Sequence, residues 1–235
     1  MNKEIIKKDL HPLYRDMLVK NTTQKPCIFC IQWGECYPDE KERGIIFVGK
    51  ACNGWYDKSD DVDILFGDSE NRIFALDDQM KWVKDREGGK AENKYNTNKS
   101  AFWRVIKKVS QKYYPEDSWY SHVAWSNLYK LSKGEGNPTK KYMNEQYESC
   151  LEIYKKEIEI FSPKFVVMFT SGWEDGFLKY LNEGKSCECI ESINWGHMTN
   201  LYKINGVYFI ATQHPQGKIE DKHVDVITRL INKYK

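Results

Sequence analysis

The chain has 235 residues, which is enough for one large or two small domains with an ample core. Hydrophobic residues make up 40% of it and aromatic residues 14%, a composition typical of a globular protein. No apolar run reaches about eighteen residues, and the N-terminus lacks the apolar core of a signal peptide, so we expect a cytoplasmic protein with no membrane contact. The net charge of +2 indicates no general preference for nucleic acid.

Seven cysteines, an odd number, suggest free thiols or metal ligands rather than disulfides. Cys27 and Cys30 form a Cys-x2-Cys pair, with Cys36 shortly after it. Such a pair is typical of half a metal or cluster site, whose other half must come from elsewhere in the fold.

The stretch 44–55 is the centre of the predicted fold. Four large apolar residues at 45–48, bounded by glycines, predict a short strand buried on both faces, and a loop of small residues follows it. Further strands are expected at 123–126, 164–169 and 207–212, and helices at 100–109, 139–161 and 221–234. Asn205-Gly206 predicts a tight turn between two extended segments.

Alternating strands and helices predict one α/β domain over residues 1–235, with a mostly parallel sheet covered on both faces. The cysteine-containing segment 1–43 is expected to pack on it. If the strands at 45–48, 123–126 and 207–212 are neighbours, their carboxyl ends bring together the loop 49–55, Asn127 and His214-Pro215. An amide can read a nucleobase edge, and an imidazole can donate to a developing negative charge. The alternative for Asn127 is a buried amide that caps the end of a strand, and the alternative for His214 is an ordinary loop histidine.

Seven short motifs occur in an order that resembles the uracil-DNA glycosylase superfamily, most closely its iron–sulfur branch. They are Cys27-Ile28-Phe29-Cys30, Phe47-Val48-Gly49-Lys50-Ala51, Ser126-Asn127-Leu128-Tyr129-Lys130, Asn137-Pro138-Thr139, Cys150-Leu151, Ser162-Pro163-Lys164-Phe165-Val166-Val167 and His214-Pro215. They extend over roughly residues 25–218. None is specific alone, and the resemblance depends on their common order.

This resemblance implies a three-layer α/β/α fold with a four-stranded, mainly parallel sheet in the strand order 2-1-3-4. It also implies an enzyme that flips a damaged base out of DNA, stacks it on an aromatic ring and cleaves its glycosidic bond. Asn127 would read the base, and His214 would stabilise the base as it departs. Phe66 is the first candidate for the stacking ring and Trp55 the second, although core packing explains both rings as well. The other expected substrate contacts are Gly49, Lys50, Ala51, Pro215 and Lys218.

Two positions depart from the pattern of the family. Where its members carry Glu, or Asp or Asn one position later, this chain has Lys50 and Ala51, and neither can act as the same general base. Asn53 can still hold a water and is the second candidate catalytic residue. Leu131 stands where a cluster ligand is expected, which leaves Cys27, Cys30, Cys36 and Cys150 as candidate ligands. We therefore expect no four-iron cluster, and zinc or an altered iron–sulfur site only if these sulfurs meet.

Three functions remain open. The first is a DNA-repair glycosylase that excises uracil or another deaminated base, which Asn127 and His214 favour. The second is a weakened or inactive member of the fold that binds nucleic acid or a nucleobase, which Lys50 and Ala51 favour. The third is a metal-binding interaction protein built on the cysteines. The expected partner is single- or double-stranded DNA or a nucleobase, and the protein is expected to be a monomer.

Overall fold

A computed structural model of the chain describes residues 1–23, 25–38, 44–52, 59, 61–67, 74, 76–88, 95–134 and 136–235. Its helices are α1 (Lys3–Lys20), α2 (Asp63–Phe66), α3 (Lys81–Asp85), η2 (Thr97–Lys99), α4 (Ala101–Ser110), η3 (Trp119–His122), α5 (Lys140–Phe161), α6 (Asp175–Leu181) and α7 (Glu220–Tyr234). Its strands are β1 (Cys27–Ile28), β2 (Gln32–Trp33), β3 (Ile45–Ala51), β4 (Ala124–Tyr129), β5 (Leu131–Ser132), β6 (Phe165–Phe169), β7 (Cys189–Asn194), β8 (Met198–Ile204) and β9 (Val207–Thr212).

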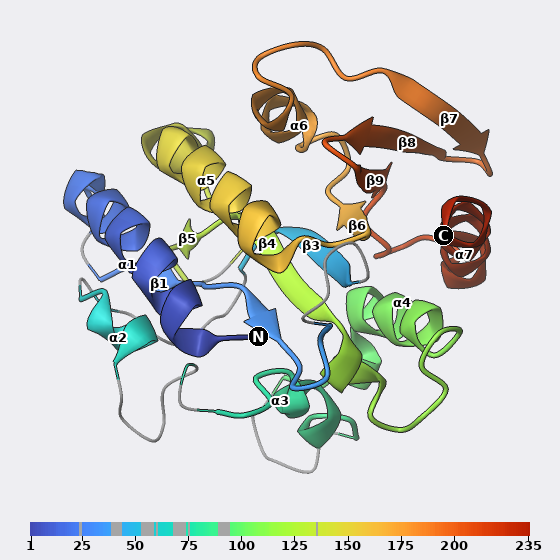
Figure 1. Cartoon of the computed structure of the whole chain (residues 1–235), viewed down its shortest axis with the longest axis horizontal. Coiled ribbons are helices and arrows are strands. Elements are labelled where there is room, and N and C mark those ends of the chain that lie inside the picture. The colour runs from blue at the N-terminus through green and yellow to red at the C-terminus, as the bar shows by residue number, and fades with distance from the viewer. Residues whose placement is uncertain are drawn as a thin grey trace.

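A seven-stranded mixed sheet in the order β2-β4-β3-β6-β9-β8-β7 organises the fold (Figure 1). β3 pairs in parallel with both β4 and β6, and β6 pairs in parallel with β9. The strands at 45–48 and 123–126 are therefore neighbours, as expected, whereas the strand at 207–212 is separated from the strand at 45–48 by β6. The four strands expected from the sequence stand side by side as β4-β3-β6-β9, which is the expected order.

The expectation of a four-stranded, mainly parallel sheet is wrong in its extent and in its direction, because the sheet has seven strands and half of its pairings are antiparallel. β2 extends the sheet in an antiparallel direction beside β4, and β8 and β7 extend it beyond β9. β1 and β5 form a separate antiparallel pair. β2 has only two residues, and most residues of β7 are exposed with the rest partly buried, so neither has the continuous apolar pattern by which a core strand is found in a sequence.

Helices cover both faces of the central sheet. Alternate residues of a strand point to opposite faces, so Ile46 and Val48 join the core that includes residues of α1 and α5, whereas Ile45 and Phe47 join the core that includes residues of α4 and α7. α5 begins where the sequence predicted, because the hydroxyl of Thr139 accepts a hydrogen bond from the backbone N–H of Tyr142 at 3.3 Å. Within the described residues, no helix combines the length and the apolar character needed to cross a membrane.

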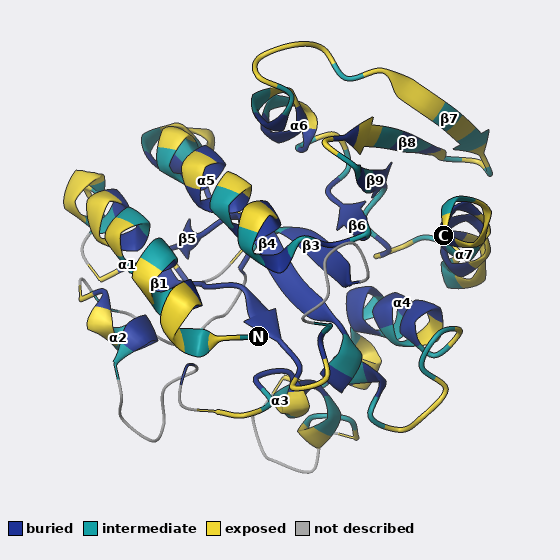
Figure 2. Cartoon of the chain, viewed as in Figure 1, coloured by how far each residue is buried: buried dark blue, intermediate teal, exposed yellow. Residues whose placement is uncertain are grey.

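The strand β7 forms an exposed edge of the sheet. Figure 2 shows the central strands buried and β7 largely exposed. Its pairing with β8 is interrupted, because the register shifts between Cys189 and Glu191. The carboxylate of Glu191 accepts hydrogen bonds from Lys233 at 2.7 Å and from Tyr234 at 2.9 Å, which ties this strand to the end of α7.

The turn between β8 and β9 has the form that Asn205-Gly206 predicted. Both residues have positive φ, 50° at Asn205 and 87° at Gly206, as a two-residue hairpin turn requires. The backbone conformation at Gly206 therefore favours a residue without a Cβ atom.

We expect Gly206→Ala to lower the free energy of unfolding by about 1–2 kcal/mol, because a Cβ atom is unfavourable in the left-handed region. Asn205→Gly should change it little, because glycine adopts the same conformation freely. Urea denaturation of both variants would measure the difference, and an alanine variant as stable as the parent would contradict this account of the turn.

Candidate active site

Gly49 and Asn127 lie side by side at the carboxyl ends of two central strands. They are register partners of β3 and β4, and a Cβ atom built on Gly49 would stand only 2.4 Å from Oδ1 of Asn127. Glycine is therefore required here for the amide to approach the backbone of β3. Asn127 is 2% exposed, and among the described residues its Nδ2 has no hydrogen-bond partner, so a buried donor is left unsatisfied there.

His214 follows β9 at the same edge of the sheet. Its backbone N–H donates to Oγ of Ser171 at 2.9 Å, which ties it to the end of β6. The backbone N–H of Gln216 donates to Nδ1 of the ring at 3.3 Å. Because Nδ1 accepts this bond, the neutral imidazole carries its proton on Nε2. Burial lowers the pKa of His214, and the positive charges of Lys50 and Lys218 lower it further, so the neutral form prevails at pH 7.

The ring of Phe102 joins these residues into one site. It comes from the first turn of α4 and stacks nearly parallel to the ring of His214, with 5.8 Å between centroids and 12° between planes. Its Cε2 atom is 3.7 Å from the Cβ position built on Gly49. Asn127, Gly49, Phe102 and His214 therefore border the same space at the sheet edge. Pro215 is buried directly beside His214.

A buried carboxylate stands at the end of the neighbouring strand β6. Oε2 of Glu174 accepts hydrogen bonds from the hydroxyl of Thr170 and from the backbone N–H of Gly172, the latter at 3.0 Å. The connecting turn contains two consecutive residues of positive φ, Ser171 at 54° and Gly172 at 90°. Non-glycine residues in this conformation concentrate at functional sites. Burial raises the pKa of Glu174.

Lys50 interacts electrostatically with this carboxylate and with His214. Its Nζ stands 5.1 Å from the centroid of the ring of Trp173, and the carboxylate of Glu174 partly offsets the lowering of its pKa by burial. Its positive charge also acts on the ring of His214. Asn127 and His214 were found by their position just after core strands, whereas Glu174 lies five residues beyond the end of β6, so the sequence analysis missed it. Phe102 was missed because its helical spacing resembles ordinary core packing.

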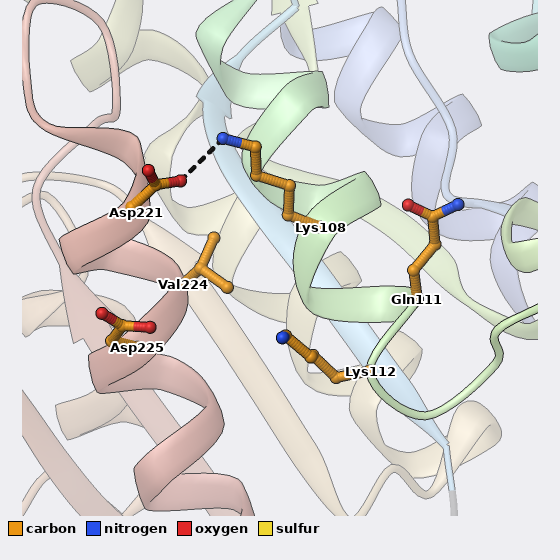
Figure 3. A pocket seen from close by; sticks show the side chains of 6 residues that line it. All are labelled: Lys108, Gln111, Lys112, Asp221, Val224 and Asp225. Carbon is orange, nitrogen blue, oxygen red and sulfur yellow. Dashed lines mark hydrogen bonds and ion pairs between the residues drawn. The ribbon is translucent and has the colours of Figure 1, made fainter.

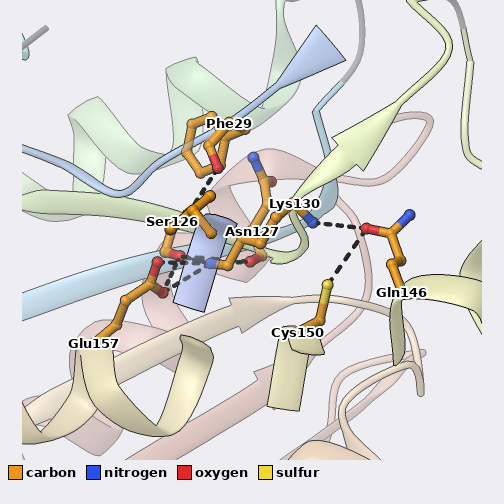
Figure 4. Close-up of polar contacts among 8 residues, drawn as sticks. Phe29, Ser126, Asn127, Lys130, Gln146, Cys150 and Glu157 are labelled. Carbon is orange, nitrogen blue, oxygen red and sulfur yellow. Dashed lines mark hydrogen bonds and ion pairs between the residues drawn. The ribbon is translucent and has the colours of Figure 1, made fainter. Parts of the chain in front are cut away.

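A buried ion pair fixes the main chain at Asn127 (Figure 4). Nζ of Lys130 donates to both carboxylate oxygens of Glu157 at 2.8 Å, to Oγ of Ser126 at 2.8 Å, and to the carbonyl oxygen of Asn127 at 2.7 Å. Oγ of Ser126 in turn donates to Glu157 at 2.7 Å. Both charged side chains are fully or almost fully buried, at 0% and 1% exposed. The ion pair therefore holds the main chain of Asn127 in place.

Some of the predicted site residues lie elsewhere. Phe66 is fully buried on the other side of the sheet, where its ring meets Phe74, with 4.8 Å between centroids, and Tyr14, with 5.5 Å between centroids. It is a core residue, so it cannot be the stacking ring. Asn53 and Trp55 lie outside the described residues. Ala51 is the register partner of Tyr129, two residues further along the strands than the pair of Gly49 and Asn127.

The four candidate metal ligands do not form one site. Cys27 pairs with Ser132 on the small sheet, Cys36 is exposed beyond β2, and Sγ of Cys150 donates to Oε1 of Gln146 at 3.3 Å. Burial raises the pKa of Cys30 to about 12, which opposes the thiolate form that metals bind. In the part of the chain that the structure describes, no three His, Cys, Asp or Glu side chains are grouped to hold a metal.

A groove between α4 and α7 lies away from these residues (Figure 3). It is lined by Lys108, Gln111, Lys112, Asp221, Val224 and Asp225, and Nζ of Lys108 donates to Asp221 at 2.8 Å. Lys108, Gln111 and Lys112 come from the carboxyl-terminal end of α4 and the residues after it, and the other three come from α7, whereas Phe102 lies in the first turn of α4. The groove is therefore a surface feature between two helices.

His223 stands behind the site on α7. It is 1% exposed, its ring is 4.5 Å from that of Trp195 between centroids, and neither ring nitrogen has a hydrogen-bond partner within the described part of the chain. Burial lowers its pKa to about 4, and electrostatic interactions with His197, His214 and Lys218 lower it further. The ring is thus held neutral and packs as an aromatic side chain.

No protein-family model matches the chain, and no curated protein matches it.

We expect Lys130→Met to lower the free energy of unfolding by about 3–5 kcal/mol, because it leaves the charge of Glu157 buried without its partner. The double variant Lys130→Met/Glu157→Leu should recover much of this loss, since both charges are then removed. Denaturant unfolding of both variants tests this. A single variant within about 1 kcal/mol of the parent would show that water reaches the carboxylate.

The free energy of unfolding should also depend on His223. In the unfolded chain this side chain protonates near pH 6.5, but in the folded protein only near pH 4. Unfolding therefore takes up a proton between these values, and stability falls as the pH is lowered, by up to about 3 kcal/mol. His223→Phe should remove this part of the pH dependence. Urea denaturation at pH 7 and pH 4.5 would test it, and parallel losses in parent and variant would contradict the assignment.

Proposed function

We propose that this protein is a uracil-DNA glycosylase-like enzyme that excises uracil or another deaminated base from DNA. The observation that carries the proposal is the meeting of Asn127 and His214 around Gly49 and Phe102, at the carboxyl ends of a parallel block of strands. The order of that block, β4-β3-β6-β9, and the helices on both of its faces agree with the three-layer fold that the motifs imply.

The chemistry of His214 suits a departing base. Cleavage of the glycosidic bond leaves negative charge on the base, which a fixed donor stabilises more strongly in the transition state than in the substrate. The hydrogen bond from Gln216 leaves the ring proton on Nε2, and the lowered pKa keeps the ring neutral, so no charge change is needed before it donates.

Asn127 is suited to reading the edge of that base. Its Nδ2 is a buried donor without a partner in the described part of the chain, and a bound base would supply an acceptor. The ring of Phe102, beside both residues, replaces Phe66 as the candidate for contact with the face of the base. Lys218, whose charge reaches His214, is placed to meet a phosphate of the strand.

A second candidate function is binding without excision. Lys50 and Ala51 occupy the positions at which members of the resembled family carry the residue that activates water. A pocket that holds a base but lacks this group would recognise a damaged nucleotide without cleaving it. The assay below separates the two functions, because it measures binding and cleavage on the same oligonucleotides.

We expect the protein to release base from single- or double-stranded oligonucleotides that carry uracil, hypoxanthine or xanthine. His214→Ala should lower the single-turnover rate about a hundredfold or more while changing the affinity for the oligonucleotide little. His122→Ala is the matched control, since its ring stacks on Tyr114 beside η3, before β4 begins.

Asn127→Ala should instead reduce the discrimination between bases, because it removes the edge contact. Tight binding of a damaged oligonucleotide with no release of base would favour the second function. Neither binding nor release with any of the three bases would contradict both.

A further inference from the structure

The turn that follows β6 contacts the backbone of His214 directly. Ser171, two residues after the end of β6, has a φ of 54°, a conformation that is uncommon for a residue with a Cβ atom. It makes two hydrogen bonds to the end of β9. Its backbone N–H donates to the carbonyl oxygen of Thr212 at 3.1 Å, and its Oγ accepts from the backbone N–H of His214 at 2.9 Å.

These two bonds continue the parallel pairing of β6 and β9 beyond its last register pair, Phe169 and Thr212. In a regular parallel ladder, the next acceptor for the N–H of His214 would be the backbone carbonyl of Ser171. Here the chain turns away in the left-handed conformation, and the side-chain hydroxyl accepts the bond instead. Position 171 therefore suits a residue that tolerates positive φ and carries an acceptor on a short side chain.

The turn itself is held on both sides of Ser171. Oε2 of Glu174 accepts hydrogen bonds from the hydroxyl of Thr170 and from the backbone N–H of Gly172, the latter at 3.0 Å. Glu174 is 7% exposed, and hydrogen bonds to a buried charged group are costly to break. The carboxylate therefore fixes the two neighbours of Ser171, and with them the place of its Oγ.

We propose that Ser171 is a positioning residue for His214, whose backbone it holds so that the imidazole meets the departing base. The proposal rests on the proposed function, because it takes His214 to be the donor to that base. Pro215 restricts the backbone of His214 from the other side. The ring then stacks on Phe102, with 5.8 Å between centroids. Misplacing a catalytic group by about 1 Å can lower a rate about a hundredfold, so this attachment matters for catalysis.

Two variants of the full chain remove the acceptor with opposite effects on the turn. Ser171→Gly removes Oγ and favours the left-handed conformation, whereas Ser171→Ala removes Oγ and keeps the Cβ atom that this conformation disfavours. We expect both to lower the single-turnover rate of base release from a uracil-containing oligonucleotide at least about tenfold, with little change in affinity. Thermal unfolding should show the alanine variant to be the less stable, so equal losses of rate would not follow stability.

Ser162→Gly is the matched control. Ser162 also has a positive φ, 38°, and its hydroxyl donates to the carbonyl oxygen of Glu159 at 3.1 Å. It stands at the end of α5, before β6 begins, whereas Ser171 follows the end of β6. Its variant should release base at the rate of the parent.

Hydrogen exchange of the His214 amide, measured by NMR without DNA, is the second readout. It should be at least about tenfold faster in both Ser171 variants, because the acceptor is lost, and unchanged in Ser162→Gly.

The exchange measurement needs no substrate, so it separates this inference from the proposed function. Faster exchange in the variants of a parent that releases no base would support the hold of Ser171 on His214 and overturn the glycosylase. Unchanged exchange in both Ser171 variants would overturn the inference, and so would faster exchange with base release at the rate of the parent. A loss of rate in Ser171→Ala alone would assign the effect to strain in the turn and would overturn it too.

Discussion

The buried pair of Lys130 and Glu157 is the constraint on which the geometry of the site depends. Two charges removed from water are tolerated only when their hydrogen bonds are almost all made, and here the ammonium is held by the carboxylate, by Ser126 and by the carbonyl of Asn127. The pair joins the end of β4 to the middle of α5, so the strand cannot shift along the helix without leaving a charge unpaired. The position of the Asn127 amide follows from this attachment.

The site combines a neutral hydrogen-bond donor, His214, with a positive charge, Lys50. His214 is held neutral by burial and by the positive charges near it, while the ring of Trp173 and the charge of Glu174 stabilise the ammonium of Lys50. Placing like charges around a histidine is unfavourable for folding, and the fold accepts this at the edge where ligands bind in α/β sheets. A negatively charged ligand would relieve the repulsion, which is the electrostatic reason for expecting nucleic acid here.

The central strands and their order could be predicted from the sequence, because continuous apolar runs such as 45–48 and 164–169 have few alternatives to a sheet covered on both faces. Asn127 and His214 were found by their position after such strands. Phe66 was wrongly expected in the site, because a Phe-Gly pair does not indicate on which face of the sheet the ring packs. In the structure the ring is buried beside Tyr14. Phe102 and Glu174 depend on how α4 and the turn after β6 meet the strand ends, which is tertiary packing that local patterns do not contain.

The outer strand β7 has a consequence for self-association. An exposed strand with free backbone groups invites a second chain to extend the sheet, and a regular ladder is what makes such an addition favourable. Here the register shift between Cys189 and Glu191 breaks the ladder, and Glu191 is drawn toward Lys233 and Tyr234 at the end of α7. An incoming strand would meet an irregular edge and a carboxylate already engaged, so the sheet ends where β7 ends. The strands β8 and β7 thus cover the edge of the parallel strands, and the irregular edge of β7 disfavours pairing with a strand of a second chain.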